Sequence, residues 1–263
     1  MKKSSLRIIS LNCNGIRSAA NKGMFDWLEQ QNADVLCLQE IKAQPADLEG
    51  LDTFAPKGWH AHFNSALRKG YSGTAIYSRA KPNAVLTSLG ATEFDDEGRY
   101  IETRFGDLSV ISLYLPSGSA GPERQESKDR FLTFFEPKLR EMMGEGRSYV
   151  ICGDWNIAHT QKDLKNWRSN QKNSGFLPHE RAWMSDVLDN VGWVDAFRVL
   201  HPEAEGEGYT WWSNRGNAFA NNVGWRIDYQ LITPDLREKL RSAHVHKTTR
   251  FSDHAPLIID YAV

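Results

Sequence analysis

The sequence is poor in cysteine and contains no long hydrophobic run. Its three cysteines, Cys13, Cys37 and Cys152, are odd in number and show no C-x-x-C spacing, which argues against a disulfide framework and a zinc site. Cys37 and Cys152 stand within apolar runs, so we expect buried, reduced thiols. No window approaches the ~18 consecutive apolar residues of a membrane span, and the N-terminus shows no signal-peptide pattern. We therefore expect a cytoplasmic protein without a membrane partner.

The sequence also lacks an excess of charge of either sign. It carries 32 Lys and Arg against 33 Asp and Glu, a formal net charge of −1. Bulk charge therefore does not indicate a nucleic-acid partner, and a DNA-binding protein of this composition would have to concentrate its basic residues on one face. With 40 % hydrophobic and 25 % charged residues, the chain is typical of a soluble globular protein. No stretch has linker composition, so we expect one domain, 1–263, acting as a monomer.

Short apolar, β-branched runs separated by turn residues predict strands at residues 6–11, 34–38, 74–77, 109–115, 149–152, 227–232 and 257–261. Helical periodicity is present at residues 24–28, 131–142 and 183–191. Pro137 lies inside the second of these, which predicts a kink or a break there. Residues 117–127 and 160–178 are polar and predict long loops. Strands that alternate irregularly with a few helices favour sheet layers covered by helices over a regular βαβ winding.

Polar side chains gather at the ends of these predicted strands. The residues concerned are Asn12, Glu40, Asp154, Asn156, Asp228, Asp253 and His254. Taken singly, each has a plain structural interpretation, because Asn favours turns and caps and isolated acids are commonly solvated. A lone histidine is also more often structural than catalytic. Their joint placement beside buried strands instead predicts one shared site at a common rim.

This set of groups suits metal-assisted phosphoryl transfer. Cleavage of a phosphodiester requires a cation that neutralises charge and an activated water. Oxygen ligands without cysteine or clustered histidine favour Mg²⁺, with Mn²⁺ as a substitute. Glu40 is the best candidate for a metal ligand, and Asn12, Asp253 and Asn14 belong to the same predicted rim.

The remaining groups suit the phosphate and the attacking water. His254 can bond the transferred phosphate, with Asp228 as the carboxylate that orients its ring. Asp154 can polarise the water. Asn156 is a hydrogen-bond donor for the developing oxyanion.

The chain resembles the exonuclease III family of abasic-site endonucleases, within the wider endonuclease/exonuclease/phosphatase superfamily. The stretches that carry the resemblance run in family order along essentially the whole chain, at residues 11–17, 38–42, 70–73, 114–118, 153–159, 173–176, 209–213, 223–229 and 251–256. It implies an α/β fold, a four-layered sandwich of two mostly antiparallel β-sheets packed face to face with helices outside. The active site would lie at one end of that sandwich.

The resemblance adds residues that the pattern alone would not have selected. It implies that Tyr114 contacts the scissile phosphate, although a core aromatic is the plainer interpretation of that residue by itself. It implies a pocket for a sugar without its base, lined by Trp211, Trp225 and Ile227, whereas we assign Trp212 to the core. An apolar pocket would select the abasic nucleotide by size, since an unpaired sugar costs least to flip out of the stack.

Lys162, Lys165, Arg168 and Lys172 form a basic cluster in loop 160–178, and the resemblance places this loop beside DNA. Lys42, Arg168 and Asn173 are then expected DNA contacts, although a charge cluster of this kind is equally typical of a solvated loop. Ser169, a small residue, would leave room for a strand that passes on either side of the lesion. Asn14 stands where some relatives carry aspartate, which bears on metal affinity.

The expected function is therefore a DNA-repair endonuclease that hydrolyses the phosphodiester 5′ to an abasic site in duplex DNA, with 3′-end processing as a side activity, in the cytoplasm or at a bacterial nucleoid. Alternatives are a 3′-end-processing specialist and a nuclease-dead relative that only binds nucleic acid. A phosphatase or phospholipase of the superfamily is expected to lack the tryptophan pocket. A secreted nuclease is expected to carry an export signal and disulfides.

Overall fold

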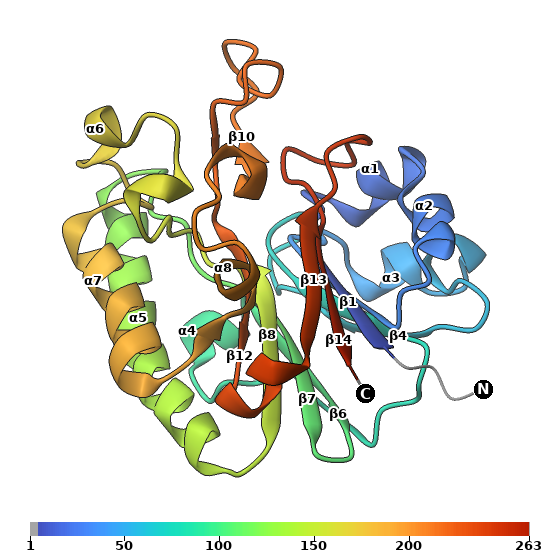
Figure 1. Ribbon diagram of the computed structural model, residues 1–263. Coiled ribbons are helices and arrows are strands. Elements are labelled where there is room, and N and C mark those ends of the chain that lie inside the picture. The colour runs from blue at the N-terminus through green and yellow to red at the C-terminus, as the bar shows by residue number, and fades with distance from the viewer. Residues whose placement is uncertain (1–4, 263) are drawn as a thin grey trace.

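A computed structural model describes residues 5–262; residues 1–4, on which the expectation about a signal peptide partly depends, lie outside it. Two six-stranded sheets form the centre of the molecule (Figure 1). In the first, neighbouring strands are antiparallel except β1 and β2, which are parallel. Its strand order is β13 (Leu240–Val245), β14 (Leu257–Ala262), β1 (Ser5–Asn12), β2 (Val35–Gln39), β4 (Thr74–Ser78) and β3 (His60–Asn64).

The second sheet has the same character, with β7 and β8 as its one parallel pair. Its strand order is β5 (Ala84–Leu86), β6 (Tyr100–Phe105), β7 (Leu108–Tyr114), β8 (Ser148–Asp154), β12 (Asp228–Ile232) and β9 (Val194–Asp195). A separate two-stranded ribbon consists of β10 (Trp211–Trp212) and β11 (Gly224–Trp225). The expected pair of mostly antiparallel sheets is confirmed.

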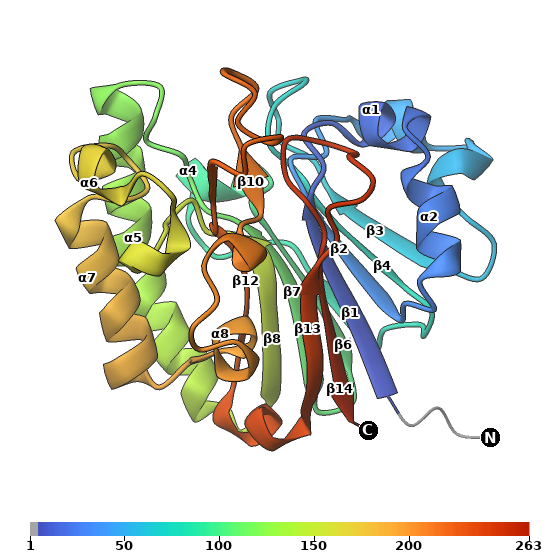
Figure 2. The ribbon, with the colours of Figure 1, turned by 45° about the horizontal axis from the view of Figure 1, so that its top comes forward.

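Helices cover the outer face of each sheet, which gives four layers (Figure 2). The first sheet is covered by α1 (Ile16–Asn21), α2 (Met24–Gln30) and α3 (Pro45–Leu48). The second is covered by α4 (Thr92–Asp95), α5 (Pro122–Gly144) and α7 (Pro178–Asp186). Short helices complete the chain: α6 (Trp167–Asn170), α8 (Ala196–Leu200), the 3₁₀ turns η1 (Asp52–Phe54), η2 (Gln161–Asp163), η4 (Gly206–Gly208) and η5 (Pro234–Lys239), and the π-helical turn η3 (Val187–Val191).

The apolar runs of the sequence are explained by burial on both faces of the central strands. In β1, Ile8 points into the core between the sheets, whereas Ile9 points into the core under the helices. Successive side chains of a strand alternate between its faces, so a strand covered twice must be apolar throughout. Cys37 and Cys152 meet in the core between the sheets, and both are free, fully buried thiols, as expected.

Two local expectations were wrong in part. A break at Pro137, one of the two outcomes expected there, does not occur, because helix α5 continues through this residue. Phe135 and Leu139 anchor it to the sheet on both sides of the proline, and Thr133, whose carbonyl loses its helical donor, is exposed to solvent. Residues 117–127 are a loop only as far as Gly121, because Pro122 begins α5 in the first-turn position that suits proline. Among residues 5–262, no helix is long and apolar enough to cross a bilayer.

Candidate active site

Strands of both sheets end at one edge of the sandwich and bring the polar residues together. Asn12 ends β1 and Glu40 follows β2; Tyr114 and Asp154 end β7 and β8. Because each of these pairs of strands is parallel, their carboxyl ends meet at the same edge of the sheet. Asp228 begins the antiparallel strand β12 directly opposite Asp154. The common rim expected from the sequence therefore exists.

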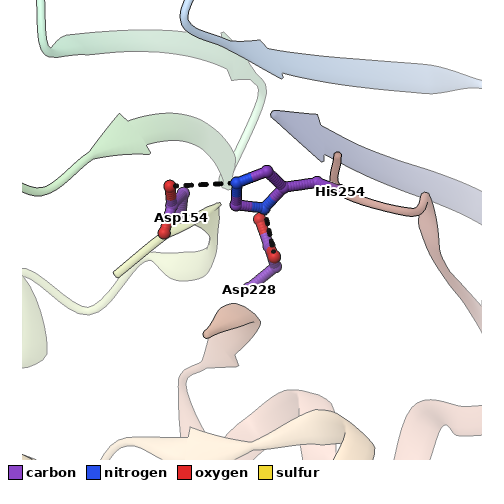
Figure 3. Close-up of side chains that lie close together, drawn as sticks. All are labelled: Asp154, Asp228 and His254. Carbon is purple, nitrogen blue, oxygen red and sulfur yellow. Dashed lines mark hydrogen bonds and ion pairs between the residues drawn. The ribbon is translucent and has the colours of Figure 1, made fainter. Parts of the chain in front are cut away.

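A buried histidine lies between two aspartates at this rim (Figure 3). His254 Nδ1 is 2.8 Å from Asp228 Oδ2, and Nε2 is 3.8 Å from Asp154 Oδ2. None of the three side chains is more than 5 % exposed. Burial alone would lower the pKa of His254, but attraction to Asp228 and Asp154 raises it to about 10. The imidazole is therefore held by Asp228 and presents its other N–H toward Asp154.

The amide of Asn12 links the two sheets within the site. Its Nδ2 donates to Glu40 Oε1 at 2.8 Å and to Asp154 Oδ2 at 2.9 Å, and the residue is fully buried. Glu40 also pairs with Lys42 Nζ at 2.8 Å. Burial opposes ionisation of Glu40, yet Lys42 and the Asn12 hydrogen bond lower its pKa. Asn12 thus fixes the separation between the acid of one sheet and the acid of the other.

Several residues of the rim adopt left-handed backbone conformations. Glu40 has φ 50°, Lys42 φ 50°, Asn14 φ 45° and Asn156 φ 51°. Such conformations are uncommon for residues other than glycine, most of all for glutamate and lysine, and they persist where surrounding contacts enforce them. Backbone strain therefore concentrates where the candidate catalytic and metal-binding side chains are presented.

The carboxylates of the site outnumber the cations bonded to them. Glu40, Asp154, Asp228 and Asp253 face two direct cationic partners, Lys42 and His254. Burial raises the pKa of Asp154 to about 7; His254 opposes this effect, and the neighbouring acids Asp228 and Glu40 add to it. An added cation would relieve this repulsion. The residues present therefore fit a bound divalent metal ion.

Two sets of groups could hold that ion. Ligand atoms of Asp154, Asp228 and His254 all lie within 4.8 Å of one another. The second set consists of oxygen ligands, namely Glu40, Asp253 and Asn12, which donates a hydrogen bond to Glu40. Asp253 belongs to it and accepts hydrogen bonds from Asn14 Nδ2 at 2.9 Å and Trp211 Nε1 at 3.1 Å.

A cavity of about 840 Å³ with an apolar side and a polar side lies at this rim. Trp211, Trp225 and Ile227 form the apolar side, and the two indole rings meet edge to face with centroids 6.2 Å apart. The polar side includes Glu40, Tyr114, Asp154, Asn156, Asp253 and His254. Trp212 lies outside the cavity and is only 1 % exposed, as expected for a core residue.

Tyr114 is held as a neutral phenol in the cavity wall. The Arg99 guanidinium lies 4.7 Å from the centre of the Tyr114 ring and donates to the Tyr114 carbonyl at 2.9 Å. Burial, reinforced by the charge of Glu40, raises the pKa of Tyr114 well above its usual range, although Arg99 opposes this shift. The hydroxyl is therefore a hydrogen-bond donor at neutral pH. Sequence patterns gave no indication of Arg99, because a buried arginine resembles a surface one in sequence.

The expected DNA-binding residues are only partly at the site. Asn173 lines the cavity and Lys42 pairs with Glu40. Arg168 instead stacks on Trp167 at 4.5 Å, and Ser169 bonds to the backbone of its own short helix; neither lines the cavity. The cavity is also lined by Lys172, a member of the basic cluster of loop 160–178. Its other lining residues, to which no role was assigned, are Ser117, Gly118, Ser119, Gly121, Ser174, Gly175 and Arg215. No sequence pattern pointed to Arg215.

Comparison with known proteins places this arrangement in a family. Residues 9–254 match the model of the Endonuclease/Exonuclease/phosphatase family. The chain is 36 % identical to an exodeoxyribonuclease of Bacillus subtilis, over 96 % of this chain and 98 % of that protein. It is 35 % identical to a DNA-(apurinic or apyrimidinic site) endonuclease of Dictyostelium discoideum, over 98 % of this chain and 71 % of that protein. The 3′ phosphatase NExo from Neisseria, solved with a product DNA hairpin, superimposes with a TM-score of 0.89 at 27 % identity, covering 98 % of this chain and 100 % of that one.

Proposed function

This chain belongs to the endonuclease/exonuclease/phosphatase family, and we propose that it is a DNA-repair endonuclease that hydrolyses the phosphodiester 5′ to an abasic site in duplex DNA, with 3′-end processing as a side activity. One observation carries the proposal. Glu40, Asp154 and His254, whose ring is held from behind by Asp228, line one cavity whose other side is apolar. The relatives named as exodeoxyribonuclease and abasic-site endonuclease, similar over nearly the whole chain, support it.

Glu40 would hold a Mg²⁺ ion, with Asp253 and Asn12 close by, and Mn²⁺ would substitute for it. The choice of this set over Asp154–Asp228–His254 rests on ligand chemistry, because Mg²⁺ prefers oxygen and the His254 nitrogen facing Asp228 is already hydrogen-bonded. A bound Mg²⁺ would neutralise phosphate charge and acidify water. Asn14 and Lys42 contact Asp253 and Glu40, so they influence how readily these acids accept a cation.

Side chains of the chain activate the water and stabilise the charge on the phosphate. Asp154 takes a proton from the attacking water, a role supported by a pKa near neutrality, where a general base is most effective. His254, oriented by Asp228, donates a hydrogen bond from Nε2 to a phosphate oxygen. As the water oxygen bonds to phosphorus, the bond to the 3′-oxygen breaks, and that oxygen takes up a proton from solvent to become the 3′-hydroxyl. Asn156 and the neutral hydroxyl of Tyr114 donate hydrogen bonds to the charge that develops on the phosphate oxygens.

Substrate choice follows from the apolar side of the cavity. Trp211, Trp225 and Ile227 present a largely apolar surface to a deoxyribose, and the indole N–H of Trp211 is already donated to Asp253. A nucleotide without its base is also the cheapest to flip from the duplex. Lys172 and Arg215 at the same cavity supply cations for backbone phosphates, which fix position without reading sequence. All of these residues come from one chain, so we propose that a monomer acts.

The test is incubation with a duplex that carries one abasic analogue, with Mg²⁺ and with EDTA. We expect metal-dependent incision immediately 5′ to the lesion, which leaves a 3′-hydroxyl and a 5′-deoxyribose phosphate. A matched duplex without the lesion controls for nonspecific cutting, and the His254→Asn variant controls for a contaminating nuclease. Trimming from 3′ ends alone would favour the end-processing alternative, and DNA binding without hydrolysis would favour the nuclease-dead one.

A further inference from the structure

A fully buried ion pair lies behind the active site and takes no part in the chemistry described above. Lys128 of α5 and Glu180 of α7 pair at 2.6 Å between Nζ and Oε1, and both side chains are 0 % exposed. Lysine and glutamate are almost never fully buried unless they are paired. Even then, the free energy lost by desolvating both charges often exceeds the free energy of their attraction. An apolar pair of similar size could therefore stabilise the fold equally well.

The contacts of this pair lead to two segments of the catalytic cavity. Lys128 Nζ donates to the carbonyl of Asn156 at 2.8 Å. Glu180 Oε2 accepts the backbone N–H groups of Gly175 and Leu177 at 2.7 Å and 3.0 Å, and Oε1 lies 3.4 Å from Ser174 Oγ. Asn156, Ser174 and Gly175 all line the cavity. Each partner of the ion pair thus holds a different part of the cavity wall.

Asn156 requires such support. Its left-handed backbone, φ 51°, is fixed from three directions. Its N–H donates to Asp154 Oδ1 at 2.9 Å, its side-chain amide donates to the carbonyl of Leu115 at 2.9 Å, and its carbonyl receives Lys128. A residue in a sparsely populated conformation persists only when its surroundings over-determine it. Lys128 is the one cationic group among these three supports.

The segment held by Glu180 is packed directly against Asn156 and the apolar pocket. Gly175 has φ +93°, and a Cβ there would lie 3.1 Å from the Asn156 carbonyl oxygen and 3.3 Å from Trp225 Cζ3. Its own carbonyl accepts the N–H of Ala158 at 2.8 Å. A shift of this segment would therefore move the oxyanion donor and the tryptophan pocket together.

We propose that Lys128 and Glu180 are positioning residues for the reaction: their buried ion pair fixes Asn156 and the segment 174–177 against each other, at the expense of stability that an apolar pair would supply. The proposal rests on the proposed function for its kinetic readout only. Helix packing between α5 and α7 is the competing role. The two roles differ, because packing can be restored without charge whereas the support of Asn156 cannot.

The experiment compares Lys128→Met, Glu180→Gln and the double variant with the matched control Arg130→Met. Arg130 lies further along α5 in an exposed pair with Glu93, with side-chain exposures of 57 % and 44 %. In the double variant no charge of the pair is buried, and the glutamine that replaces Glu180 still offers an oxygen to Gly175 and Leu177. We expect the melting temperature of the double variant to exceed that of Lys128→Met and to approach wild type.

The rate is expected to stay low in both variants that lack Lys128. We expect kcat on the abasic duplex to fall about 10- to 100-fold, the usual effect of losing a group that orients a catalytic one, with KM within about twofold of wild type. Glu180→Gln keeps the size of the side chain, so it should yield folded protein even if Lys128→Met does not, and its kcat should fall as well. Arg130→Met should match wild type in kcat and in KM.

A second readout does not depend on activity. In ¹⁵N-labelled protein, the assigned amide resonances of Asn156 and Gly175 should move in the three variants and stay in place in Arg130→Met. Wild-type kcat in the double variant, a loss of kcat that equals the loss of folded protein, or unmoved Asn156 and Gly175 resonances would each overturn the proposal. If wild type fails to cut the abasic duplex, the proposed function fails, and the resonances alone decide the positioning role.

Discussion

Loop 160–178, which carries part of the cavity wall, is tied to the segment between β11 and β12 by a second buried ion network. Asp163 is fully buried and lies 2.7 Å from Arg226 Nε and 2.5 Å from Arg198 Nη2. It also accepts hydrogen bonds from the N–H and hydroxyl of Thr160 at 2.8 Å and 2.9 Å. Arg226 stands directly between the pocket residues Trp225 and Ile227.

The Asp163→Asn variant removes this charge and little else. Burial alone would raise the pKa of Asp163, but Arg226 and Arg198 lower it from 3.8 to about 2. Since one pKa unit corresponds to about 1.4 kcal/mol, the charge contributes about 2.5 kcal/mol to the free energy of unfolding at pH 7. Breaking a buried pair costs up to about 5 kcal/mol, but Arg226 keeps a second partner, Asp195 Oδ2, at 2.8 Å. We therefore expect the smaller value.

The stability contributed by ionised Asp163 decreases as the pH falls. The pKa of Asp163 is lower in the folded state than in the unfolded state, so its contribution is complete above about pH 5 and is lost as the pH falls through 3.8 toward 2. The difference between wild type and Asp163→Asn should therefore shrink to about half at pH 3.

Urea denaturation followed by tryptophan fluorescence at pH 7, 4 and 3 measures this difference. The control is Glu203→Gln, which removes an exposed pair with Lys162 in the same region and should leave the midpoint unchanged. A difference that is absent at pH 7, or equally large at pH 3, would refute the assignment of the effect to the ionised Asp163.

Three further predictions concern the site itself. Glu40→Gln should raise the Mg²⁺ concentration for half-maximal incision at least about tenfold, as measured by cation titration; an unchanged titration would remove Glu40 from the metal site. Trp225→Ala should raise KM for the abasic duplex about tenfold with a smaller effect on kcat, and equal losses on a duplex end and on an internal lesion would argue against a lesion pocket. Ser169→Trp should reduce internal incision while 3′-end trimming persists, and undiminished internal incision would contradict the proposal that a small residue leaves room for the strand.

Sequence patterns located the central strands well and the edge strands poorly, for a physical reason. The predicted runs correspond to strands buried on both faces, such as β1, β4 and β8. The strands that were missed include all four sheet edges, namely β13, β3, β5 and β9. An edge strand exposes one face, so its polar residues interrupt the apolar run; in β13 only Leu240 and Ala243 are buried, and β5 is exposed throughout. Burial pattern, rather than strand propensity, therefore limited the prediction.

The site was predictable to the extent that its residues end buried strands. Asn12, Glu40 and Asp154 each lie within two residues of the end of a predicted apolar run, which gave their common location. Tyr114 required the family resemblance, because a tyrosine that ends an apolar strand is indistinguishable from a core residue. Lys128 could not be found, because its partner Glu180 lies 52 residues away along the chain and a lysine on a helix normally indicates a solvated face.

The most direct test of the whole assignment is the location of the cation and the incised phosphate in one structure. Crystals of the protein with Mn²⁺ and an incised abasic duplex would show the ion by anomalous scattering. We predict one manganese peak bonded to Glu40, with the product phosphate within hydrogen-bond distance of His254 and Asn156 and the His254–Asp228 bond intact. A manganese ion on the nitrogens of His254, or a product phosphate that contacts neither His254 nor Asn156, would contradict the assignment.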